Sequence, residues 1–178
     1  GWDAADNLVA VTDAVGARTE YTYHPTGAVS SITEPTGART LVECDDAGLA
    51  VAVTDPMGTT TRLTRDAFGR TVSVTDPTGA VTRLRWSPDG KLVERTHPDA
   101  AVESWDYDGE GNLLRHNDSV GAVTAYTYGS FDLLASRTDP DGSLTAYAWD
   151  TERRLTAVTN PLGQTWSYEY DAAGRLVA

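Results

Sequence analysis

The chain has 178 residues, of which 40% are hydrophobic and 22% are charged, and its formal net charge is −12 at pH 7. This acidic balance argues against nucleic acid and against anionic membrane surfaces as partners, because both attract a surplus of Lys and Arg. No apolar run reaches the roughly 20 residues that span a bilayer, so we expect no membrane insertion. We recognise no signal peptide in these residues, and the single cysteine, Cys44, excludes an internal disulfide.

The sequence repeats itself every 21 residues without an insertion or deletion. One series of positions holds mostly Trp or Tyr, often followed by Asp: Trp2, Tyr23, Cys44, Arg65, Trp86, Tyr107, Tyr128, Trp149 and Tyr170. Such a period is typical of arrays in which each unit completes its core against its neighbours. We therefore predict one array over residues 1–178, with repeats starting at 2, 23, 44, 65, 86, 107, 128 and 149 and a partial repeat at 170–178. Both ends fall inside a repeat, so we expect a piece of a longer chain.

Residues 65–86 show the order of elements within one repeat. A turn at 65–69 is followed by a β-favouring segment at 70–75, a second turn at 76–79 and a second β-favouring segment at 80–86. In the turns, Asp accepts local backbone hydrogen bonds, Pro presets φ, and Gly adopts the left-handed conformation. Asp-Pro-x-Gly turns occur at 55–58, 76–79 and 139–142, and Asp-x-x-Gly turns at 45–48, 66–69, 108–111 and 171–174.

The positions of proline and glycine support this division into strands and turns. All eight prolines and every glycine except Gly1 fall in a turn, and the expected strand interiors contain neither residue. No long segment shows a helical apolar period. We therefore predict an all-β fold, a continuous array of antiparallel β-hairpins. A sheet of so many strands should form a curved or spiralling ribbon, because strand twist accumulates across it.

The odd length of the repeat constrains its turns. Side chains alternate between the two faces of a strand, so a two-strand unit of 21 residues keeps each position on one face only if one loop is odd and the other even. We expect a three-residue loop with a bulge glycine at the Asp-x-x-Gly turn and a four-residue loop at the Asp-Pro-x-Gly turn. This register would place Tyr126 opposite Leu113 and would fill two strand columns with aromatic and aliphatic side chains.

The motifs resemble the YD repeat of the Rhs (rearrangement hot spot) family over residues 2–178. The first half of that repeat is similar to Tyr107-Asp108-Gly-Glu-Gly111 and to Tyr170-Asp171-Ala-Ala-Gly174, and the second half is similar to Asp55-Pro56-Met-Gly58 and Asp76-Pro77-Thr-Gly79. This chain departs from the pattern at four turn glycines, which are replaced by Asp6, Ala100, Asp132 and Arg153.

The resemblance implies a structural role without enzymatic activity. In bacterial Rhs proteins and insecticidal toxin-complex subunits such repeats form a spiralling β-ribbon, a hollow shell that encloses a C-terminal toxin, and in teneurins they form a rigid body that carries adhesive modules. The implied partners are a toxin or effector domain of the same parent protein and the neighbouring repeats. The implied location is outside the cell or at its surface.

Candidate catalytic and metal-binding residues are few. Asp55 and Asp76 are superficially similar to the paired aspartates with which some family members cleave themselves, but turn capping already explains both. The three histidines, His24, His97 and His116, occupy different repeat positions without metal-ligand spacing. We therefore expect no catalytic residue, no metal site and no cofactor.

One strand column interrupts its apolar pattern with basic residues. Val11, Ile32, Val53 and Val74 are followed by Arg95, His116 and Arg137 before Val158 restores the pattern. These three residues form a possible interaction patch for cargo or for a neighbouring turn of the ribbon. Alternatively, they lie on a solvated face with their charges paired, for example to Glu94 or Asp118.

Three further possibilities remain open at this point. A β-propeller is the structural rival, because two repeats span the length of one blade. The functional rival is a carbohydrate or cell-surface adhesion module, because periodic Tyr and Trp side chains could stack on sugar rings. We also expect unpaired strand edges near Trp2 and Leu176, which would favour self-association.

Overall fold

The structure is a computed structural model that describes residues 1–178. It contains sixteen β-strands and one short 3-10 turn, η1 (Ser130–Asp132), and the strand order in the sheet follows the sequence from β1 to β16. No helix is long or apolar enough to cross a membrane. The predicted all-β array of antiparallel hairpins is confirmed, and a propeller of separate four-stranded blades is not observed.

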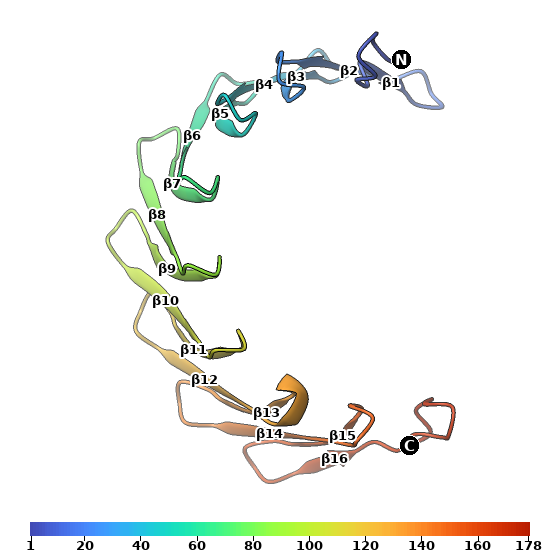
Figure 1. Ribbon diagram of the computed structural model, residues 1–178, viewed down its shortest axis with the longest axis vertical. Coiled ribbons are helices and arrows are strands. Elements are labelled where there is room, and N and C mark those ends of the chain that lie inside the picture. The colour runs from blue at the N-terminus through green and yellow to red at the C-terminus, as the bar shows by residue number, and fades with distance from the viewer. The chain divides into compact units, whose positions relative to one another are not determined.

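The strands belong to two compact units, residues 1–84 and residues 85–178. Within each unit, successive strands lie side by side and a loop joins each strand to the next (Figure 1). The first seven strands are β1 (Ala10–Thr12), β2 (Arg18–Tyr23), β3 (Val29–Thr33), β4 (Arg39–Cys44), β5 (Ala50–Thr54), β6 (Thr60–Arg65) and β7 (Thr71–Thr75). The unit boundary falls within β8 (Val81–Trp86). The strands that follow are β9 (Leu92–Thr96), β10 (Val102–Tyr107), β11 (Leu113–Asn117), β12 (Val123–Tyr128), β13 (Leu134–Thr138), β14 (Leu144–Trp149), β15 (Leu155–Thr159) and β16 (Thr165–Ser167).

The two kinds of turn have the same backbone geometry. In the Asp-Pro-x-Gly turn, the Asp55 N–H donates to Thr59 O at 2.9 Å and the Gly58 N–H donates to Asp55 O at 2.9 Å. The same two bonds form around Asp66, at 2.9 and 3.0 Å. Both turns are therefore three-residue loops closed by a left-handed glycine, and the predicted four-residue Asp-Pro-x-Gly loop is wrong.

A β-bulge adds the extra residue that the odd repeat length requires and that two three-residue loops do not provide. In the hairpin of β6 and β7, Arg65 pairs with Thr71 but Thr64 pairs with Ser73, so one residue of β7 has no partner. The same shift recurs in the hairpins β2–β3, β4–β5, β10–β11, β12–β13 and β14–β15. Two odd loops and one extra residue keep each repeat position on one face, which is the condition that the 21-residue period imposes.

The three-residue loop between β11 and β12 and the bulges in the other hairpins change which side chains face each other across the strands. Arg115 of β11 pairs with Ala125 of β12, so the expected pairing of Tyr126 with Leu113 is wrong. Tyr126 instead pairs with Arg137 of β13, and Trp105 pairs in the same way with His116. The aromatic column therefore faces the column that contains the basic residues.

The sheet has almost no fully buried side chain. Only Ala10, Ser31 and Ala52 are buried, and these three residues share one repeat position. Side chains of the neighbouring strands contact this position: Arg39 Nη2 donates to Ser31 Oγ at 3.2 Å, and Thr22 Oγ1 lies 2.7 Å from the same oxygen. Most other strand residues are half-buried, because no second layer packs on the sheet within these residues.

The turn aspartates should make the array sensitive to acid. The Thr59 hydroxyl and N–H hold the pKa of Asp55 below its ordinary value of 3.8, and the Thr78 hydroxyl and Ala80 N–H do the same for Asp76. Because the folded-state pKa is lowered, this stabilisation is present at neutral pH and is lost as the pH falls through the Asp range. The double substitution D55N/D76N keeps the Oδ1 atom that accepts the backbone N–H groups in each turn, so it should lose less stability than the wild type between about pH 5 and pH 2. Urea midpoints across this range would measure the difference, and parallel curves for the two proteins would contradict the prediction.

Candidate functional site

Arg95 and His116, two of the three predicted patch residues, meet around Glu103. Arg95 Nη1 lies 3.1 Å from Glu103 Oε2, and His116 Nε2 lies 2.8 Å from Glu103 Oε1. His97 Nε2 is 3.6 Å from the same carboxylate, whose side chain is only 16% exposed. Trp105 stacks on the His116 ring at 5.2 Å, and the Arg95 guanidinium lies 5.5 Å from the Trp105 ring centre. We call these five residues the Glu103 cluster.

Strand register explains why these residues meet. Arg95 of β9 pairs directly with Glu103 of β10, and Trp105 of β10 pairs directly with His116 of β11. Glu103 and Trp105 are two residues apart, so both project from the same face of β10. The cluster therefore joins three adjacent strands on one face of the sheet, where the Arg95 guanidinium and two imidazole rings surround one carboxylate.

The structure does not bring Arg137 into this cluster. Its guanidinium forms an ion pair with Asp139 at 2.6 Å. The suggested partners of the basic column are also occupied elsewhere, since Glu94 pairs with Arg85 at 2.7 Å and Asp118 Oδ1 accepts the N–H groups of Val120 and Ala122. Each member of the predicted patch therefore has an acidic partner within the chain, which is Glu103 or Asp139.

Sequence reasoning missed Glu103, although the repeat contains a signal for it. The Glu103 position holds threonine in most copies: Thr19, Thr40, Thr61, Thr82, Thr124 and Thr145. His97 similarly stands where most copies have a turn aspartate. When several positions depart from the repeat at one place, we expect their side chains to interact, because one change can compensate for another.

The repeating aromatic position links each repeat to the strand before it. The hydroxyls of Tyr23, Tyr107, Tyr128 and Tyr170 donate to a backbone carbonyl fifteen residues earlier, at distances of 2.7 to 3.2 Å. Trp149 Nε1 donates to the equivalent carbonyl of Leu134 at 2.8 Å. Arg65 replaces the aromatic ring but keeps the function, because its Nε and Nη2 both donate to Ala50 O. The conserved feature of this position within the chain is therefore a hydrogen-bond donor at the end of a long side chain.

Cys44 occupies this position with a side chain that is too short to reach the equivalent carbonyl. The substitution C44Y should therefore restore the interstrand bond to Val29 O and raise the free energy of unfolding by about 1 kcal/mol. Urea denaturation would measure the change, with C44F as a control that adds the ring without the hydroxyl. Equal gains from the two substitutions would show that packing, and not the donor, determines stability at this position.

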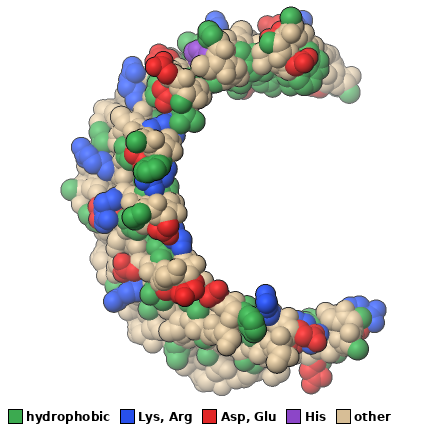
Figure 2. Space-filling view, viewed as in Figure 1, with side chains coloured by type: hydrophobic (Ala, Val, Ile, Leu, Met, Phe, Trp, Pro, Cys, Tyr) green, Lys and Arg blue, Asp and Glu red, His purple; other side chains and the backbone are tan.

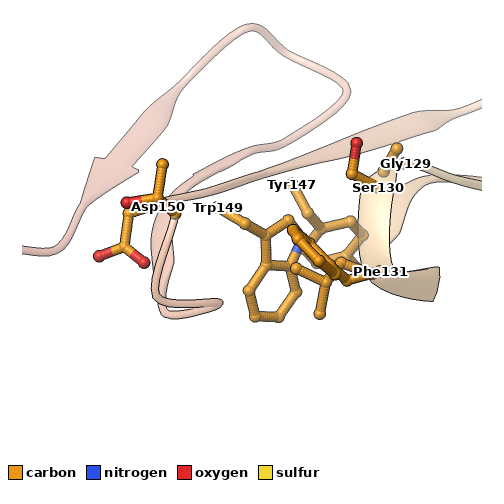
Figure 3. Close-up of a pocket in the computed structure, with 9 residues that line it drawn as sticks. Gly129, Ser130, Phe131, Tyr147, Trp149 and Asp150 are labelled. Atoms are coloured by element: carbon orange, nitrogen blue, oxygen red, sulfur yellow. The ribbon is translucent and has the colours of Figure 1, made fainter.

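A shallow recess opens at the end of β14, between two adjacent turns of the second unit. Its volume is about 370 Å³, and the rings of Phe131, Tyr147 and Trp149 lie close together in it (Figure 3). The Trp149 ring is fixed by its bond to Leu134 O, and Arg153 lies 4.5 Å from the centre of the Phe131 ring. Two of the three rings in this recess therefore have a contact that positions them within the chain.

The turn that carries Phe131 is unlike the other turns of the chain. Gly129 replaces the capping aspartate and Asp132 replaces the left-handed glycine, as the repeat pattern indicated. Phe131 and Asp132 both have positive φ, at 62° and 58°. Each such residue costs about 1–3 kcal/mol unless other contacts stabilise it. Phe131 is also 64% exposed, so its ring is held in water at the surface of a strained turn.

The turn aspartates that were considered as catalytic candidates are occupied by their own turns. Asp55 Oδ1 accepts the N–H groups of Met57 and Thr59, and Asp76 Oδ1 accepts those of Thr78 and Ala80. His24 Nε2 lies 2.8 Å from Val42 O. No group of three or more His, Cys, Asp and Glu side chains is arranged to hold a metal ion.

Several solved structures share the fold of this chain. A crystal structure of TcdB2–TccC3–Cdc42 matches with a TM-score of 0.73 and 21% identity over 90% of this chain. A structure of the Photorhabdus luminescens Tc holotoxin pore matches with a TM-score of 0.71 and 20% identity, also over 90%. This chain covers only 10% of either matched chain, so the likeness shows the fold of one segment. None of the curated proteins matches.

The family assignment rests on the repeat itself. The family model described as RHS Repeat matches six overlapping stretches, at residues 2–39, 45–80, 65–102, 107–144, 130–164 and 149–178. These stretches cover nearly the whole chain and follow the same period as the turns and bulges. The chain therefore belongs to the RHS repeat family.

Proposed function

We propose that this chain is a non-enzymatic wall segment of an Rhs-type shell, which encloses or presents a C-terminal toxin or effector of a longer secreted or surface protein. The observation that carries the proposal is a single-layered sheet with one apolar face. In the first unit, Tyr21 pairs with Ile32, Val42 with Val53, and Leu63 with Val74, and nothing within the chain packs over them. A half-buried apolar column favours a partner on that face.

The polar side chains also support a structural wall and not a catalytic site. The turns use their aspartates for backbone hydrogen bonds, and charged side chains of both signs are interspersed on the visible surface (Figure 2). The family membership and the fold shared with Tc holotoxin chains support the same role. The two faces of the sheet then have different roles. The small buried residues of one face hold the ribbon together, and the larger apolar residues of the other face contact the enclosed partner.

Limited proteolysis of the parent protein would test this proposal. We expect the segment C-terminal to the shell to resist protease while the protein is folded and to be digested once urea opens the repeats. The isolated C-terminal segment serves as the control, since it should be digested without urea. Digestion at the same rate in the folded parent and in isolation would contradict an enclosing wall.

A further inference from the structure

Two arginines of the first unit have no partner within the chain. Arg62 of β6 and Arg83 of β8 are exposed and form no hydrogen bond, ion pair or ring contact. Arg115 of the second unit is the one other basic side chain of this kind. Every other Lys and Arg contacts an acidic group, a backbone or hydroxyl oxygen, or an aromatic ring. In a chain whose net charge is −12, Arg62 and Arg83 therefore remain available to a partner.

Strand register places Arg62 and Arg83 on the same face of the sheet. Arg62 pairs with Thr75 of β7, and Arg83 pairs with Ser73 of the same strand. Because Ser73 and Thr75 are two residues apart, both arginines project from one face, which is opposite to the face that carries Leu63. The Cα atoms of the two arginines are separated by two strand spacings and by two residues along the strand, a distance of about 12 Å.

The surface between the two arginines is uncharged and has short side chains. Neither β5 nor β7 carries a charged residue, and the hydroxyls of Thr64 and Ser73 lie 2.7 Å apart and bond to each other. Two acidic groups are near in the strand pairing, and neither forms an ion pair with the arginines. Glu43 is two strands away from Arg62, and the Asp76 carboxylate accepts the N–H groups of its own turn. The chain itself therefore supplies no anion to this surface.

The charge of the chain decides which anion fits these arginines. A guanidinium favours a carboxylate or a phosphate, because its planar fork donates two parallel hydrogen bonds to either group. The net charge of −12 repels a dense polyanion such as nucleic acid, and two arginines neutralise only two of its phosphates. A segment that carries two carboxylates among neutral residues meets far less repulsion. Residues four apart on one side of an extended chain are about 13 Å apart, which matches the separation of the arginines.

We propose that Arg62 and Arg83 bind an extended acidic peptide segment of a partner protein, through two carboxylates that are four residues apart. Each guanidinium receives one carboxylate, and the neutral residues between them lie over Thr64 and Ser73. The site is on the face opposite to the apolar column. The proposal therefore adds a second interaction surface to the wall segment and does not depend on what the shell encloses.

A titration of the isotopically labelled 178-residue chain, followed by nitrogen–proton correlation NMR at low ionic strength, tests the proposal. The probe is a nine-residue peptide of glycine and serine with glutamates at its third and seventh positions. We expect a dissociation constant on the order of 1 mM, with chemical-shift changes centred on β6 and β7, and weaker binding at high salt. A peptide with glutamines at the same two positions should not bind, because it keeps the shape of the probe without its charges.

Matched variants separate this site from a general effect of positive charge. The R62Q/R83Q variant should bind the glutamate peptide about tenfold more weakly and keep the wild-type melting temperature, because neither side chain makes a contact in the fold. R115Q removes another exposed, unpaired arginine, whose partner across the strands is Asp106, so it should bind like the wild type.

Four results would overturn the proposal. They are no shift changes with the glutamate peptide, equal binding by the wild type and R62Q/R83Q, an equal loss of binding in R115Q, or tighter binding of single-stranded oligothymidylate than of the peptide. The last result would assign the two arginines to phosphate groups.

Discussion

Replacing Arg65 by alanine should lower the free energy of unfolding by about 2–3 kcal/mol, the largest loss that we expect from one side chain outside the turns. The Arg65 guanidinium donates to Ala50 O, to Gly69 O at 2.9 Å and to Thr71 Oγ1 at 3.2 Å. It therefore ties β6 to the strand before it and to the turn after it. Alanine leaves these acceptors without their charged donor, and urea denaturation followed by circular dichroism would measure the loss.

The conservative control for this position is tyrosine. Most repeats use Tyr or Trp at this position to reach the same carbonyl, so R65Y should recover most of the stability that R65A loses. If R65Y were as destabilised as R65A, the interstrand bond would not explain why this position repeats.

Replacing Glu103 by alanine should lower the free energy of unfolding by about 1–2 kcal/mol. The substitution removes the acceptor shared by Arg95 and His116 and leaves the Arg95 guanidinium without its ion pair beside Trp105. The Trp105 environment should change as well, because the Arg95 and His116 side chains that flank it lose their anchor. Urea midpoints and tryptophan fluorescence would report the two effects together.

Glu94 provides a matched control for Glu103. It also pairs with an arginine across strands, but its partner Arg85 has a side chain that is 63% exposed. An exposed pair of this kind contributes about 0.2–1 kcal/mol, so E94A should cost less than E103A. Equal losses from E94A and E103A would mean that Glu103 is one more surface ion pair and that the cluster has no particular role.

The strands and turns of this fold could be predicted from the sequence, because glycine and proline fall only where the backbone must turn. Asp55, Pro56 and Gly58 mark such a turn directly. The register could not be predicted in the same way. Parity required one extra residue per repeat, but the sequence does not distinguish a longer loop from a bulge within β7. The bulge therefore appeared only in the strand pairing.

The candidate sites also combine features that the sequence predicted with features that it did not. The basic column around Arg95 and His116 was visible in the sequence, but its carboxylate partner was not, because Glu103 lies on the neighbouring strand of a hairpin whose register was unknown. The replacements of turn glycines at Asp132 and Arg153 were visible in the sequence, but only the turn at Asp132 departs from the common geometry, because the turn at Arg153 keeps both backbone bonds around Asp150. That these turns and the rings of Phe131 and Trp149 enclose a recess depends on side-chain direction, which periodicity does not give.

Electron cryomicroscopy of the parent protein tests the proposed role most directly. A shell predicts that residues 1–178 form part of a closed wall and that density for the C-terminal segment lies against the apolar column of Ile32, Val53 and Val74. An open ribbon, with the C-terminal segment outside it and this column facing solvent, would contradict the account.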